Sequence, residues 1–85
     1  QADFEVYPNP FKETTSVSFD LSDHQDVTLS IYDVSGRTLK VIEGEFAQGF
    51  NQVTVNRSDL NGAGVLYYQL ESADKVATKK MIIID

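Results

Sequence analysis

Apolar and polar side chains alternate along most of the chain. Five runs place apolar residues at every second position: Val17–Leu21, Val27–Ile31, Leu39–Val41, Val53–Val55 and Leu66–Leu70. A period of two puts the apolar side chains on one face of a β-strand and the polar ones on the other. β-Branched and aromatic residues, which favour strands, dominate these runs. Each run therefore predicts a strand with one buried and one exposed face.

Two further strands are predicted near the ends of the chain. The first, Phe4–Tyr7, stops at residues 8–10, where two prolines fix the backbone angle φ. The last, Val76–Ile84, contains Met81–Ile84, which is apolar at consecutive positions. Such a run predicts a strand that is covered on both faces, or one that pairs with something beyond this chain.

Residues typical of turns separate the predicted strands. They cluster at residues 8–10, 22–26, 33–36, 48–51, 61–64 and 72–75. About seven strands at roughly ten-residue intervals predict an all-β fold, an immunoglobulin-like antiparallel β-sandwich.

The 85 residues fit a single domain. A domain of this size buries only roughly 60–65% of its unfolded surface, and so thin a core disfavours a deep catalytic pocket.

Composition excludes several classes of function. The chain has 7 lysines and arginines against 13 aspartates and glutamates, a net charge of −6. This balance argues against binding to nucleic acid or to an anionic membrane surface. No apolar run approaches the ~20 residues of a membrane-spanning helix. The chain has no cysteine for a disulfide or a thiolate metal site, and we expect no cofactor.

Candidate chemistry is sparse. His24 is the only histidine and lies in a polar loop, without the partners that a catalytic triad or a zinc site needs. Asp20, Asp23 and Asp26 recur every three residues, but Ca²⁺ takes six to eight oxygens and this spacing matches no defined calcium loop. A solvated loop is the favoured interpretation. We predict neither a resident metal nor an enzyme.

Aromatic side chains allow a sugar-binding platform as an alternative to core packing. The absence of tryptophan weakens the platform, and alternation requires either Tyr67 or Tyr68 to face inward. The residues in question are Tyr7, Tyr32, Tyr67, Tyr68, Phe4, Phe11 and Phe50.

Four segments are distinguished by the order of their residues along the chain rather than by their amino-acid composition. They are Tyr7-Pro8-Asn9-Pro10-Phe11, residues 29–37 (LSIYDVSGR), residues 60–70 (with GVLYYQL after Gly62-Ala63) and residues 79–83 (KKMII). Together they resemble the C-terminal sorting domain, type A, of the type IX (Por) secretion system of Bacteroidetes. The resemblance covers nearly the whole chain.

Each segment also has a physical interpretation. Pro8 and Pro10 fix φ on either side of Asn9, which ends the first strand and directs the chain toward the second. Gly64 lets the chain turn sharply into a strand.

The second and fourth segments carry charge. Asp33 can accept backbone hydrogen bonds within its turn, and Gly36 supplies the positive φ of a hairpin with a bulge. Arg37 then lies at the rim of the loop, where its guanidinium can bind a carboxylate. Lys79 and Lys80 place positive charge just before the apolar end of an acidic chain.

The resemblance implies that the domain is an address on an exported cargo. Such cargo crosses the inner membrane by a separate signal, and the outer-membrane translocon then recognises the C-terminal domain. A sortase-like signal peptidase cuts upstream of it, and the cargo is released or anchored at the cell surface. We expect recognition through the last strand and nearby turns. The candidate residues are Asp33, Gly36, Arg37, Gly64, Lys79, Lys80, Met81, Ile82 and Ile83.

Two other functions remain open. One is an immunoglobulin-like accessory module that binds a polysaccharide or a protein, and the other is a structural spacer in a longer chain. Because a sorting domain ends its precursor, the stop at Asp85 directly after an apolar strand favours sorting. We therefore expect residues 1–85 to be one sorting domain, with cargo domains upstream.

Overall fold

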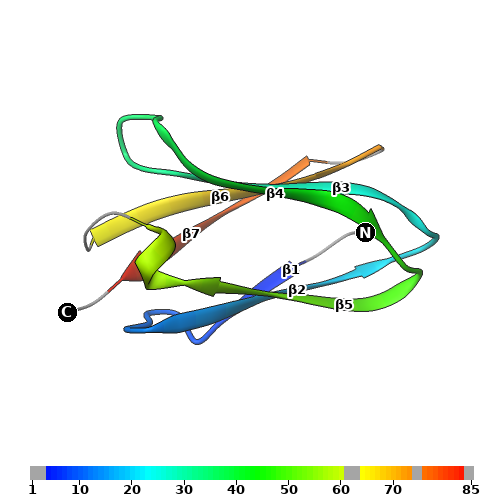
Figure 1. Ribbon diagram of the computed structural model, residues 1–85, viewed down its shortest axis with the longest axis horizontal. Helices are drawn as coiled ribbons and strands as arrows, with labels where there is room; N and C mark the ends of the chain where they lie inside the picture. The colour runs from blue at the N-terminus through cyan, green and yellow to red at the C-terminus, as the bar shows by residue number, and fades with distance from the viewer. Residues whose placement is uncertain (1–3, 61–63, 74–75, 84–85) are drawn as a thin grey trace.

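The computed structural model describes residues 4–60, 64–73 and 76–83. Two antiparallel sheets face each other (Figure 1). One sheet has the strand order β1-β2-β5, and the other has the order β4-β3-β6-β7. The strands are β1 (Phe4–Tyr7), β2 (Thr14–Leu21), β3 (Gln25–Tyr32), β4 (Thr38–Phe46), β5 (Gly49–Asn56), β6 (Gly64–Ser72) and β7 (Val76–Ile83).

The predicted all-β sandwich is confirmed, and all seven predicted strands are present. A 3₁₀ turn, η1 (Arg57–Asp59), follows β5. Of the turns predicted at 61–64 and 72–75, residues 61–63 and 74–75 lie outside the described residues, as does Ile84 of the last predicted strand, and Gly64 and Ser72 belong to β6. No helix in the described part of the chain is long and apolar enough to cross a membrane.

Alternation places the core between the sheets. In β2 and β3 the apolar residues are buried at every second position, and the residues between them are half-buried or exposed. Phe4 of β1 contacts Tyr68 of β6 edge-to-face across the two sheets, with ring centroids 5.3 Å apart. The buried apolar residues are Phe4, Phe11, Val17, Phe19, Leu21, Val27, Leu29, Ile31, Val55, Leu60, Leu66, Tyr68 and Leu70.

Strand β4 is longer than the alternation predicts. It runs from Thr38 to Phe46, whereas the pattern marks only Leu39–Val41. Only Leu39, Ile42 and Phe46 of this strand pack against the core. Among the described strands β4 pairs only with β3, at the edge of its sheet. This backbone pairing continues through Glu43–Glu45, where the sequence has no apolar alternation.

Candidate recognition surface

The motif segments converge at one end of the sandwich (Figure 1). The loop 8–13 joins β1 to β2, the turn 33–37 joins β3 to β4, and η1 follows β5 at this end. Gly64, the first residue of β6, pairs with Ile83, the last residue of β7. An ion pair of 3.5 Å between Lys40 Nζ of β4 and Asp59 Oδ2 of η1 links the two sheets here. We call this the motif end.

Strand β1 begins toward the opposite end. Phe4 pairs with Phe19, close to the end of β2, and Tyr7 pairs with Ser16, close to its start. Phe4, the first residue of β1, therefore lies farther from the motif end than Tyr7, its last residue.

The proline-containing loop is fixed to the sandwich at three points. Thr15, only 1% exposed, donates a hydrogen bond from Oγ1 to the carbonyl oxygen of Pro8 at 2.7 Å. The side chain of Phe11 is buried in the core. The backbone N–H of Arg57 donates to the carbonyl of Glu13 at 2.8 Å. Sequence reasoning missed Thr15, although its place two residues before Val17 puts it on the buried face of β2.

Asp33 organises the turn between β3 and β4. Its Oδ1 accepts hydrogen bonds from the backbone N–H of Ser35 (2.9 Å) and Arg37 (3.0 Å) and from the hydroxyl of Ser35 (2.6 Å). The Ser35 hydroxyl is the largest cause that lowers the pKa of Asp33 below its ordinary value of 3.8. Gly36 adopts a φ of 90°, in the left-handed region, and the register shifts after Ile31, which marks the bulge.

Arg37 belongs to the same network. Its Nε donates to Asp33 Oδ2 at 3.1 Å, and 68% of its side chain is exposed. The backbone N–H and the Nε–H of Arg37 thus both support the turn, while most of its side chain is exposed to solvent.

Strand β7 forms an edge of the four-stranded sheet. It pairs with β6 on one side, and among the described residues no strand pairs with its other side. In this register Lys79 lies opposite Tyr68 and Lys80 opposite Tyr67, while residues 81–83 lie opposite residues 64–66. The side chains of Lys79, Lys80, Met81, Ile82 and Ile83 lie outside the described part of the chain.

Charge is unevenly distributed along the sandwich. We divide the molecule at the middle of β2 and β3, between Val17 and Ser18 and between Thr28 and Leu29. The motif half holds the described cations Lys12, Arg37, Lys40 and Arg57 against the carboxylates Glu13, Asp33 and Asp59. The opposite half holds no described lysine or arginine, and its described carboxylates are Glu5, Asp20, Asp23, Asp26, Glu43, Glu45 and Glu71.

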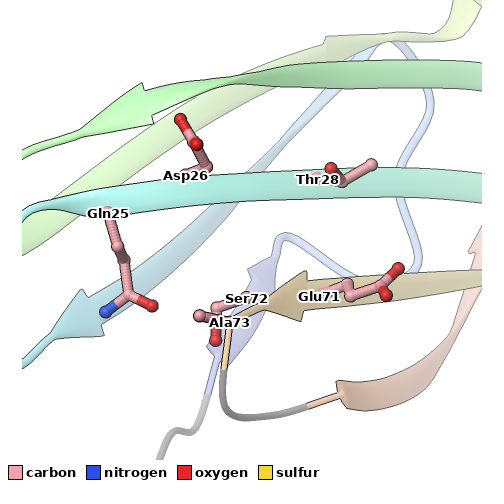
Figure 2. A pocket seen from close by; sticks show the side chains of 6 residues that line it. All are labelled: Gln25, Asp26, Thr28, Glu71, Ser72 and Ala73. Carbon is pink, nitrogen blue, oxygen red and sulfur yellow. The ribbon is translucent and has the colours of Figure 1, made fainter.

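We call the opposite half, with its seven described carboxylates, the acidic half. An open hollow of about 580 Å³ lies there. Figure 2 shows its lining, which β3 and the end of β6 supply. Of the described residues, Asp26 and Glu71 bring two carboxylates to its lining and no lysine or arginine lines it, so the described lining is acidic. The lining residues are Gln25, Asp26, Thr28, Glu71, Ser72 and Ala73.

Among the described residues the metal candidates do not come together as a site, and His24 contacts one carboxylate. Among the described residues no three histidine, cysteine, aspartate or glutamate side chains come together as a metal site. Asp20, Asp23 and Asp26 are exposed around the turn between β2 and β3. His24 is also exposed, and its Nε2 lies 3.3 Å from Glu45 Oε1.

The seven candidate aromatic residues do not form one platform, although Tyr32 lies directly opposite Tyr67 where β3 pairs with β6. Tyr68 is 1% exposed and faces the core, whereas Tyr67 is 39% exposed, as alternation predicts for such neighbours. Phe4 and Phe11 are buried. The aromatics exposed on the three-stranded sheet lie far apart, because Tyr7 pairs near the start of β2 and Phe50 near its end.

Comparison with models of protein families identifies the family of the chain. A family model described as the secretion system C-terminal sorting domain matches residues 5–84. The chain belongs to this family. The sorting domain is the C-terminal signal of type IX secretion cargo, and the family is not catalytic. The signal implies interaction with the secretion system and export to the cell surface or beyond.

Solved structures share the fold of the sorting domain. The crystal structure of dimeric latent PorU from Porphyromonas gingivalis matches 98% of this chain with a TM-score of 0.77 and 20% identity. A β-glucosidase from Kluyveromyces marxianus (TM-score 0.57, 8% identity) and one from Listeria innocua in complex with glucose (0.55, 10%) match all of it. This chain spans only 9%, 14% and 16% of those three chains, respectively. No curated protein matches the chain.

Proposed function

We propose that residues 1–85 are one sorting domain that follows a cargo, and that the type IX translocon recognises it through the motif end and β7. The cargo passes through the periplasm, crosses the outer membrane and stays at the cell surface or leaves the cell. A sortase-like signal peptidase cuts upstream of the domain. The domain itself supplies no chemistry to these steps.

The convergence of the motif segments carries this proposal. Segments that are up to about seventy residues apart in the chain meet at one end of the sandwich, and β1 begins toward the other. A cargo that precedes β1 would join the domain away from the motif end. It would leave the loop 8–13, the turn 33–37 and the end of β7 accessible to a receptor.

The edge position of β7 supports strand pairing as the mode of recognition. An edge strand presents unpaired backbone N–H and C=O groups that a strand of another protein can bind. Such main-chain bonds give affinity whatever the side chains are. One address can therefore serve cargo proteins of unrelated sequence.

A reporter fusion tests the role of the last strand. The reporter carries an export signal at its N-terminus and residues 1–85 at its C-terminus, in a host with the secretion system. We expect deletion of residues 79–85 to hold the reporter in the periplasm. Unchanged secretion of the deletion variant would refute the role of β7.

Because the deletion shortens a strand of the sheet, a second variant keeps the strand intact. Lys79→Gln with Lys80→Gln removes the two charges and is expected to slow secretion. Lys75→Gln, just before β7, is the control and is expected to secrete normally. Circular dichroism of each purified domain separates loss of recognition from loss of the fold.

A further inference from the structure

Two apolar side chains project from the motif end. Tyr7, next to the proline-containing loop, is 78% exposed, and Val34, in the turn between β3 and β4, is 72% exposed. These are the two highest values among the exposed large apolar residues that the structure describes. Valine is also unusual in a tight turn, where glycine, asparagine, aspartate and serine are favoured.

Hydrogen bonds fix the backbone next to both side chains. Tyr7 immediately precedes Pro8, whose carbonyl accepts the hydrogen bond of the buried Thr15 at 2.7 Å. Val34 lies between Asp33 and Ser35, which are joined by two hydrogen bonds to Asp33 Oδ1. An exposed side chain on a fixed backbone loses little conformational freedom on binding. It therefore contributes more of its burial to affinity than one on a loose loop would.

Charge indicates the character of the partner. Every described lysine and arginine lies in the motif half, and the opposite half holds carboxylates without a described lysine or arginine. An acidic partner surface is attracted to the motif end and repelled by the other end, so it meets the domain in one orientation.

We propose that Tyr7 and Val34 are anchors that fill apolar pockets on an acidic protein surface of the secretion system. The inference rests on the proposed function and adds to it the contact residues and the chemistry of the receptor. The proline-containing loop then has two roles. It ends β1, and it presents Tyr7 to the receptor.

The anchors are tested with the reporter fusion described above. We expect Tyr7→Ala, and separately Val34→Ser, to lower the initial rate of export at least about fivefold, as truncation of an interface anchor does. Tyr7→Phe keeps the ring and is expected to retain most of the rate. Phe50→Ala is the matched control, because Phe50 is 67% exposed on the same sheet as Tyr7 but in the acidic half.

The charge of the receptor is tested with variants of equal net charge. Lys12→Glu replaces a positive charge by a negative one and so lowers the charge of the motif end by two units, and the pair Gln48→Glu with Gln52→Glu lowers the charge of the opposite half by the same amount. We expect only Lys12→Glu to slow export. Equal effects of the two variants would overturn the acidic receptor.

The outcomes separate the anchors from the proposed function. If the unaltered fusion stays in the periplasm, the proposed function fails. If it is exported and Tyr7→Ala and Val34→Ser are exported as fast, the function stands and the anchors are wrong. Sedimentation of the purified domain with anionic lipid vesicles, if lost in Tyr7→Ala, would assign the anchors to a membrane and overturn a protein receptor.

Discussion

The hydrogen bond between Thr15 and Pro8 gives a quantitative test of how the motif end is built. Replacing Thr15 by valine keeps the shape of the side chain and removes the donor. A typical hydrogen bond contributes about 0.5–1.5 kcal/mol to stability. Pro8 is exposed, so water can replace part of the lost bond at its carbonyl. We therefore expect Thr15→Val to lower the free energy of unfolding by about 1 kcal/mol, roughly 4–8 °C in Tm for a domain of this size.

Thermal and urea unfolding followed by circular dichroism measures this change. Thr14→Val is the matched control, since the same atoms change one position earlier on the exposed face of β2. Its effect is expected to stay within about 0.5 kcal/mol, as for most surface substitutions. If Thr15→Val unfolds at the temperature of Thr14→Val or above it, the bond does not stabilise the loop and our account of its fixation is refuted.

Further predictions concern the turn and the core. Gly36→Ala, at a φ of 90°, should lower the free energy of unfolding in urea by about 1–2 kcal/mol. Gly44→Ala is the control, because Gly44 lies in β4 without a positive φ, and it should be neutral or slightly stabilising. Equal losses of stability in the two variants would contradict the turn geometry. Tyr68→Ala should lower stability by about 3 kcal/mol or more and Tyr67→Ala by less than about 1 kcal/mol, and the reverse order would place the wrong tyrosine in the core. The lowered pKa of Asp33 means that its stabilisation of the turn is present above pH 3.8 and is lost as the pH falls through the lower pKa of the folded state. The carboxyl carbon resonance of Asp33 should therefore titrate with a midpoint below 3.8, and a midpoint at or above 3.8 would refute the network.

Much of the fold follows from the alternation of side chains. A strand with one solvent-exposed face has apolar residues at every second position, so β2, β3 and β6 can be predicted from the sequence. The same alternation requires that either Tyr67 or Tyr68 face inward. The turn chemistry of Asp33 and Gly36 is equally local. These features depend only on residues a few positions apart.

The remaining features depend on contacts between distant residues. No local pattern tells that β1 and β5 flank β2 while β3 lies in the other sheet. The bond of Thr15 to Pro8 spans seven residues and needs the fold of the loop. The convergence of the motif segments and the separation of charge both follow from strand direction, which a net charge of −6 does not reveal.

The central claim is that this domain is sufficient as an address for type IX export. The most direct measurement is the location of a fluorescent reporter that carries an inner-membrane export signal and residues 1–85 at its C-terminus. It is made in matched strains with and without a functional secretion system. Our account predicts reporter at the cell surface or in the medium only when both the domain and the system are present. Reporter retained in the periplasm of the complete strain would contradict it.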